Sequence, residues 1–369
     1  MSMVRSYGYP VESYEVQTED GYILDMFRIP PRQQANKKIQ HSITNAVFLM
    51  HGMLTNSESF IYGGPSESIA LRLADLGYDV FVGNARGTIY GQRHTKLNPK
   101  KDAAFWRFCW HEIGMKDLPA MMSKALSVSG QDKLIHIGHN EGTTSFYVLA
   151  SEMPQMVASK VERHISLGPM VFLGNSTNEI LLSIEAHAKQ RSWVIKNLGA
   201  NTFNPTEELI NSAEMNCMQT MNDETMCKNV YFLLNGYNSR HLNQTTMKQV
   251  MPRVPSTMSV REILHLVQLK TTGRFETFSD AGEAREYDLS KVTVPVALLY
   301  STSDNLCTSS DLQTLKQRLP NVYWKCDVEY AYNNLDMLYS EYMDRAVLVN
   351  ILLALQRDTK ASSEENRSV

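Results

Sequence analysis

One short segment constrains the fold of this chain more than any other. Residues Leu134–Ile137 form a mostly apolar run, which leads directly into Gly138 to Gly142, reading Gly-His-Asn-Glu-Gly, and a helical pattern starts at Thr143. A strand, a sharp turn with glycine two positions either side of its centre, and a helix are the context of a nucleophile elbow. The central residue, Asn140, tolerates unusual backbone dihedrals. Taken alone, the segment is equally compatible with an ordinary strand-to-helix turn.

Further apolar runs and helical patterns alternate along the chain. Strands are predicted at residues 45–51, 79–83, 133–138 and 294–300, and helices at 66–76, 118–128, 143–152 and 341–356. Such alternation predicts an α/β fold with a mostly parallel central sheet and helices on both faces. Between 173 and 288, helical segments rich in Met and Asn dominate. We therefore predict a core at 1–172 and 289–357, an inserted helical cap at 173–288, and a flexible tail at 358–369.

Composition and charge exclude several classes of function. The 369 residues carry a net charge of −3, which gives no reason to expect a nucleic-acid partner. No apolar run approaches the roughly eighteen residues of a transmembrane helix. The chain as given begins without an apolar segment, so no signal peptide is predicted in it. Five cysteines occur without a Cys-x-x-Cys pair or a His/Cys cluster, so neither a metal site nor a cofactor is expected.

Several longer motifs identify a family. Residues 7–10 read Tyr-Gly-Tyr-Pro, 18–24 read Thr-Glu-Asp-Gly-Tyr-Ile-Leu, and 105–114 read Phe-Trp-Arg-Phe-Cys-Trp-His-Glu-Ile-Gly. Further matching segments lie at 51–54, 83–87, 117–120, 264–265 and 273–275. Together they resemble the acid lipases, the gastric, lysosomal and insect lipases of the α/β-hydrolase superfamily, over about residues 7 to 357. The resemblance implies an α/β-hydrolase fold with a helical cap.

The same resemblance assigns positions in a catalytic site. The family has Gly-His-Ser-Gln-Gly at the elbow, so Asn140 stands at the nucleophile position. Asp304, in Ser-Asp-Asn-Leu, matches the family's acid, and Asn334, before Leu-Asp, stands where the family has histidine. The order nucleophile, acid, histidine is that of this superfamily. The oxyanion-hole donors are expected to be the backbone N–H groups of Met53 and Glu141.

These substitutions remove the chemistry of acyl transfer. A serine attacks while histidine takes its proton and the acid orients the imidazole, so Asn140 and Asn334 abolish two of three roles. Losing either residue from such a unit costs on the order of 10⁶ in turnover. His139, His111 and Cys307 are not expected to replace them. Asn140 and Asn334 are instead expected to be able to hydrogen-bond each other.

Glu141 replaces the family's glutamine beside the elbow. A carboxylate here opposes the stabilisation of an oxyanion, because like charges repel in a water-poor site. The alternative is that Glu141 points into solvent or pairs with a basic group.

Three functions follow from this pattern. The first is a catalytically inactive lipase homologue that keeps an apolar pocket and binds a lipid or fatty-acyl ligand under the cap. The second is an active neutral-lipid or carboxylic-ester hydrolase with an atypical site. The third is a protein-interaction module on a lipase scaffold, with a protein partner at the cap surface.

The resemblance also suggests where the protein resides. Cys217 and Cys227 resemble the family's cap disulfide, and the family is exported, so a secreted or luminal (lysosomal) protein is expected. Asn-x-Ser/Thr sequons occur at Asn175, Asn243 and Asn366. These are candidate glycosylation sites, since such triplets are acceptors in secreted proteins.

Overall fold

The fold was examined in a computed structural model, which describes residues 1–32, 45–221, 223–237, 240–280, 283–328 and 331–357. Its centre is a nine-stranded sheet in which the order is β1-β2-β4-β3-β6-β7-β8-β9, with β5 paired to β2. The strands β4, β3, β6, β7, β8 and β9 lie side by side in this order, and each is parallel to the next. Strand β2 is antiparallel to each of its partners β1, β4 and β5. The strands are β1 (Glu12–Gln17), β2 (Tyr22–Ile29), β3 (Ala46–Met50), β4 (Asp79–Val82), β5 (Arg93–His94), β6 (Leu134–His139), β7 (Val161–Leu167), β8 (Val296–Tyr300) and β9 (Val322–Asp327).

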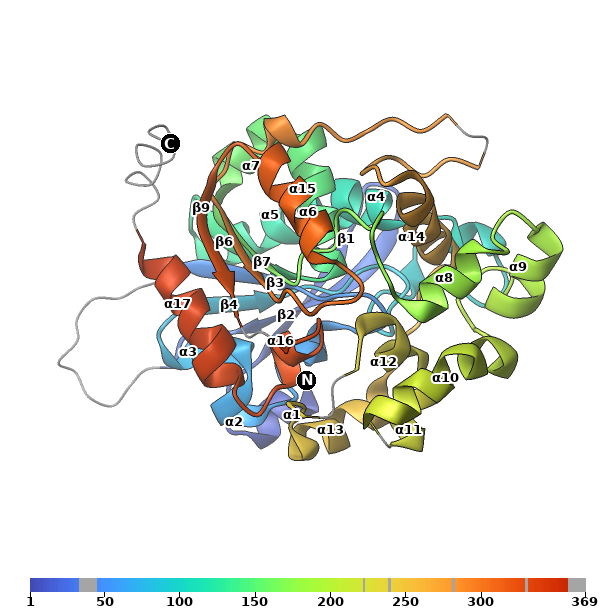
Figure 1. The fold of residues 1–369 in the computed structure, drawn as a ribbon. Helices are drawn as coiled ribbons and strands as arrows, with labels where there is room; N and C mark the ends of the chain where they lie inside the picture. Colours follow the sequence, from blue (N-terminus) through green and yellow to red (C-terminus); the bar gives the residue numbers. More distant parts are fainter. Residues whose placement is uncertain (33–44, 222, 238–239, 281–282, 329–330, 358–369) are drawn as a thin grey trace.

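Helices cover both faces of this sheet, because its central strands are apolar on both sides and must be shielded from water. Figure 1 shows α3 and α17 on one face and α5, α6 and α7 on the other. The helices of this core are α1 (Ser2–Ser6), α2 (Gly64–Glu67), α3 (Ile69–Asp75), α4 (Trp110–Glu112), α5 (Leu118–Ser129), α6 (Glu141–Glu152), α7 (Pro154–Lys160), α15 (Ser309–Arg318), α16 (Asp336–Tyr339) and α17 (Val349–Gln356).

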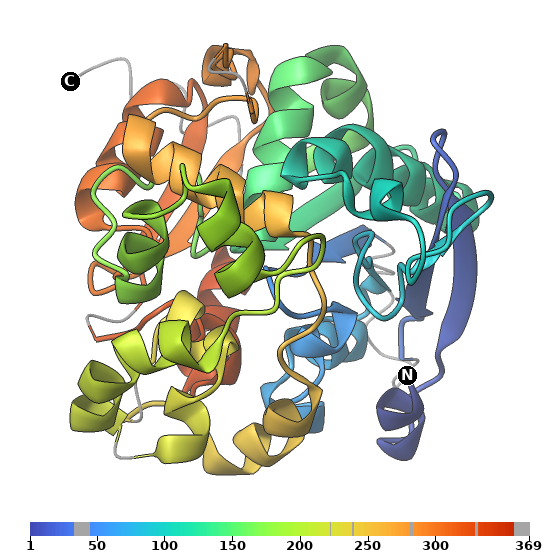
Figure 2. The same cartoon turned by 90° about the vertical axis from the view of Figure 1, so that its right-hand side faces the viewer.

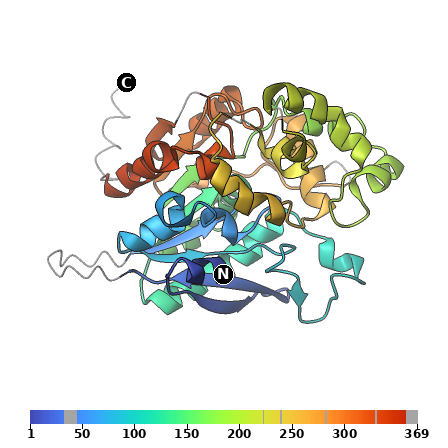
Figure 3. The same ribbon diagram turned by 90° about the horizontal axis from the view of Figure 1, so that it is seen from below.

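A group of helices is inserted between β7 and β8. They are α8 (Glu179–Glu185), α9 (Arg191–Leu198), α10 (Glu207–Met221), α11 (Glu224–Cys227), α12 (Val230–Asn235), α13 (Gln244–Val250) and α14 (Val260–Thr272). Figures 2 and 3 show them, in green to orange, gathered to one side of the sheet. We call this group the cap. The domain limits at 172/173 and 288/289 stay predictions.

The predicted fold class is confirmed, and the structure adds detail. The helix predicted at 66–76 is two helices, because Ser68 has extended backbone dihedrals of φ −107° and ψ 130°. The helix predicted at 341–356 begins as a π-helical turn at Met343–Leu348 before α17. The tail predicted at 358–369, with Asn366, lies outside the described residues. Within the described ranges, no helix has the length and apolar character needed to cross a membrane.

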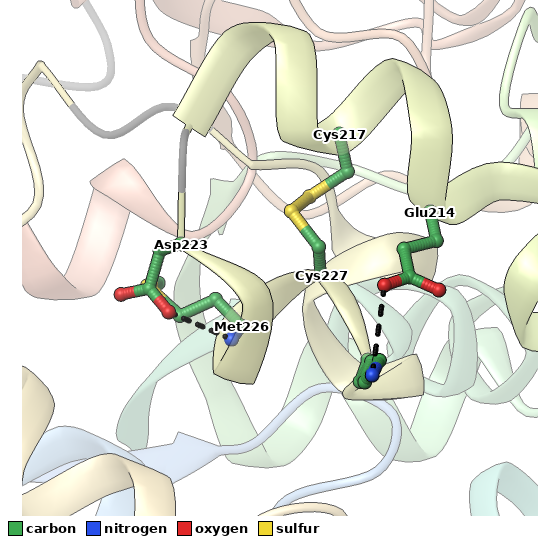
Figure 4. The surroundings of a disulfide bond; sticks show 6 residues. Glu214, Cys217, Asp223, Met226 and Cys227 are labelled. Carbon is green, nitrogen blue, oxygen red and sulfur yellow. Dashed lines mark hydrogen bonds and ion pairs between the residues drawn. A yellow bond between two sulfur atoms is a disulfide. The ribbon is translucent and has the colours of Figure 1, made fainter.

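The cap carries a disulfide. Cys217 within α10 and Cys227 at the end of α11 are bonded, as Figure 4 shows, and both are fully buried. The Asp223 side chain accepts a hydrogen bond of 3.1 Å from the Met226 backbone N–H and caps the short helix α11. The disulfide therefore joins α10 to α11 across a separation of ten residues.

Candidate active site

The turn after β6 has the geometry of a nucleophile elbow. Asn140 has φ 52° and ψ −116°, a combination that side-chain-bearing residues rarely adopt. A Cβ atom on Gly138 would lie 2.7 Å from the Gly142 carbonyl carbon, so glycine is required for the chain to fold back on itself here. The predicted strand, turn and helix are thus those of the structure, and the residue at the centre is fully buried.

The Asn140 side chain lies against the predicted oxyanion hole. Its Oδ1 accepts a hydrogen bond of 3.3 Å from the backbone N–H of Met53. Met53 follows β3, and Asn140 follows the neighbouring parallel strand β6, so sheet topology brings the two residues together. A donor that would stabilise an oxyanion during acyl transfer is occupied here by the protein's own amide.

The other two triad positions are joined to each other. Asn334 Nδ2 lies 3.1 Å from Asp304 Oδ2 and 3.1 Å from the carbonyl oxygen of Gly168, and it donates to both. The expectation that Asn140 and Asn334 bond each other is wrong for the described structure. Each amide has other partners: the Met53 N–H for Asn140, and two acceptors for Asn334.

Asp304 is held by the loop that follows β8. Its Oδ1 accepts hydrogen bonds from the backbone N–H groups of Leu306 at 2.8 Å and Cys307 at 3.3 Å. Burial raises the pKa of Asp304, and the Asn334 amide acts in the opposite direction. Asp304 is thus held by two backbone N–H groups and by the Asn334 amide, which cannot accept a proton from it.

Glu141 faces the cap. In the described structure it neither points into solvent nor pairs with a basic group. Its side chain is buried and forms a hydrogen bond with the carboxyl of Glu262 on α14. Burial raises the pKa of both groups, because two neighbouring carboxylates without water would repel each other. This favours a state in which the two carboxyl groups share a proton. Glu262 also accepts a hydrogen bond of 2.6 Å from the Ser259 N–H at the start of its helix. Sequence analysis missed Glu262, whose only local signal is a helix-capping pattern.

The three residues considered as replacement catalysts have other contacts. His139 Nε2 lies 2.9 Å from the backbone oxygen of Asn334, and burial lowers the pKa of this imidazole to about 4. His111 Nδ1 lies 2.8 Å from the hydroxyl of Tyr287. Burial raises the pKa of the Cys307 thiol well above its usual range, which opposes thiolate chemistry. None of these described contacts places a base beside Asn140.

Comparison with known proteins shows the family of this chain. Residues 45–331 match the family described as alpha/beta hydrolase fold, and residues 1–64 match a partial alpha/beta-hydrolase lipase region. The chain is 33% identical to Lipase 1 of Drosophila melanogaster, over 99% of this chain and 82% of that protein. It is 28% identical to human gastric triacylglycerol lipase, over 97% of this chain and 91% of that enzyme.

A solved structure supports the fold alone. The crystal structure of a putative aryl esterase from Burkholderia cenocepacia superposes with a TM-score of 0.55 and 14% identity. The match covers 94% of this chain and all of that one.

Proposed function

Because this chain belongs to the α/β-hydrolase family, in its acid-lipase branch, we propose that it is a lipase relative that binds lipid without hydrolysing it. The contact that carries the proposal is the hydrogen bond from the Met53 N–H to Asn140 Oδ1. The side chain that replaces the nucleophile also occupies the group that would stabilise the transition state. Two requirements of acyl transfer are therefore lost through one residue.

Retention of a lipid ligand follows from what surrounds this site. The elbow, the acid and the cap persist around Asn140, and α14 contacts the elbow helix through Glu262 and Glu141. A scaffold that keeps its cap while losing its nucleophile retains the part of a lipase that binds and loses the part that cleaves. We expect an apolar pocket between cap and elbow to be the binding site.

Two measurements on the purified native protein test the proposal. Mass spectrometry of extracted lipids should find a long-chain lipid in stoichiometric amount. Adding such a lipid should raise the melting temperature, because a ligand selective for the native state stabilises it by RT ln(1 + [L]/Kd). Steady hydrolysis of a short-chain p-nitrophenyl ester, abolished by Asp304→Ala, would instead support the active-hydrolase alternative.

We further propose that the protein resides outside the cell or in a luminal compartment. A disulfide between Cys217 and Cys227 persists in oxidising environments and is rare in the cytosol. Protein from its native source should yield these two cysteines unmodified by alkylation until a reductant is added. The sequon residue Asn175 is exposed, but its Nδ2 donates to Asp311 Oδ1 at 3.0 Å. The Asn243 side chain caps α13, and its Nδ2 donates to Glu67 Oε2 at 2.7 Å.

The interaction-module alternative has one observation in its favour. The side chain of Met215 on α10 is 70% exposed and lines an open surface pocket, with its neighbours Asn211, Glu214, Met218 and Gln219. A partner at this surface would be lost with Met215→Glu, whereas lipid binding under the cap would be unchanged.

A further inference from the structure

Two buried amides in this site each have one polar atom without a partner. Asn140 uses Oδ1 to accept from Met53, and its Nδ2 is unpaired. Asn334 uses Nδ2 to donate twice, and its Oδ1 is unpaired. Neither residue has solvent-exposed surface. A buried polar atom left unpaired costs roughly 1–3 kcal/mol, so the site gains from any group that pairs both.

The orientation of each amide is determined by its neighbours. The Met53 backbone N–H can only donate, so the oxygen of Asn140 must face it. The Gly168 carbonyl can only accept, so the nitrogen of Asn334 must face that oxygen. The unpaired atoms are therefore a donor on Asn140 and an acceptor on Asn334.

Asn140 and Asn334 both form hydrogen bonds with backbone carbonyl groups at the end of β7. The backbone N–H of Asn140 donates to the Leu167 carbonyl at 3.0 Å, and Asn334 Nδ2 donates to the next carbonyl, that of Gly168. His139 Nε2 also contacts the Asn334 backbone oxygen. Both residues thus lie at the end of β7, each with one unpaired side-chain atom, and the described structure has no direct hydrogen bond between the two side chains.

We propose, building on the lipid-binding function above, that the ligand is a neutral lipid alcohol whose single hydroxyl bridges Asn140 Nδ2 and Asn334 Oδ1. The hydroxyl oxygen accepts from Asn140, and its O–H donates to Asn334. An ester carbonyl can only accept and leaves Asn334 Oδ1 unpaired. A carboxylate also only accepts, and it adds a negative charge close to Asp304, whose described partners include no cation. The site therefore discriminates against the esters that a lipase cleaves.

The test compares three ligands with the same alkyl chain: dodecanol, methyl laurate and laurate, near neutral pH. Their dissociation constants are measured by tryptophan fluorescence on the full chain. We expect the alcohol to bind roughly tenfold more tightly than the ester, the factor that one buried hydrogen bond contributes. Equal binding of alcohol and ester would overturn this inference and leave lipid binding intact. Binding of none of the three would contradict the proposed function itself.

Two variants localise the effect. Asn140→Asp replaces the donor Nδ2 by an oxygen, and Asn334→Leu removes the acceptor; each should abolish the preference for alcohol. Asn197→Asp is the matched control, because this buried asparagine of α9 has both amide atoms engaged within the cap. A preference that survives both site variants would place the hydroxyl elsewhere and overturn the inference. If a variant fails to fold, the ligand series on the unmodified chain still decides.

Discussion

Asn334 Nδ2 donates to Asp304 Oδ2 at 3.1 Å, so the residues at the expected acid and histidine positions are hydrogen-bonded to each other. An amide holds the carboxyl in position without the ability to take up a proton. The proposed loss of catalysis is therefore testable by restoring the family's residues at Asn140 and Asn334.

Restoring two residues together should restore activity. Asn140→Ser alone lacks a general base, and Asn334→His alone lacks a nucleophile, so each should remain inactive. The double variant should hydrolyse a short-chain p-nitrophenyl ester measurably, because triad members act as a unit. Serine also frees the Met53 N–H for the oxyanion. Adding Asp304→Asn is the control and should abolish the gain. A folded double variant without activity would show that the scaffold has diverged further than these residues.

Protein stability should fall between acidic and mildly basic pH. Burial raises the pKa of Glu141 and of Glu262, so the folded state binds the protons of this pair more tightly than the unfolded state. The stabilisation is complete below the ordinary carboxyl pKa of 4.5 and is lost as the pH rises through the raised pKa values. The groups facing the pair are Glu262 itself and, more distantly, Asp117, which is ion-paired with Arg86. Urea unfolding near pH 5 and pH 8 measures the difference.

Glu141→Gln should reduce this pH dependence, since the glutamine amide donates to Glu262 without a proton of its own to lose. Some dependence should remain, because burial also raises the pKa of Asp336, to about 8. The control is Glu224→Gln, which changes an exposed carboxylate that pairs with Lys228. An unchanged pH profile in Glu141→Gln would mean that the carboxyl pair does not govern it.

The cap disulfide should contribute measurably to stability. Replacing both Cys217 and Cys227 by serine should lower the free energy of unfolding by about 2–3 kcal/mol, the value for a loop of this size. Chemical unfolding of oxidised protein measures the loss. Cys326→Ser, which changes a free and half-buried thiol, should have little effect. Equal stability of the double variant and the parent would contradict a stabilising role.

The buried ion pair below the site should be far more sensitive than a surface pair. Arg86 is 2% exposed and donates to Asp117 at 2.7 Å and to Asp20 at 2.7 Å. Removing Arg86 leaves the fully buried Asp117 carboxylate without a counter-charge, so Arg86→Ala should cost about 3–5 kcal/mol. Arg93→Ala, in a largely exposed pair with Glu15, should cost less than about 1 kcal/mol. Comparable losses in the two variants would show that burial is not the deciding factor.

The sequence alone determined the fold class, and it indicated which residues stand at the family's catalytic positions. Ala46–Met50 is a continuous apolar run and Leu134–His139 is a mostly apolar one, and such local patterns are readable without the structure. The Gly-x-Asn-x-Gly elbow is also local, because its glycines are required by crowding within a few residues. The inserted helical segment was recognisable from the change in pattern after β7.

Only the tertiary structure decided which atoms of that site meet. The contact of Asn140 with Met53 spans 87 residues, and that of Asn334 with Gly168 spans 166. The pairing of Glu141 with Glu262 joins the elbow helix to a cap helix, and no local pattern records it. Side-chain partners of this kind depend on how strands and helices distant in sequence pack together. Residue types thus indicated which residues stand at the family's catalytic positions, whereas packing determined that Asn140 contacts the Met53 N–H and that Asn334 contacts Asp304.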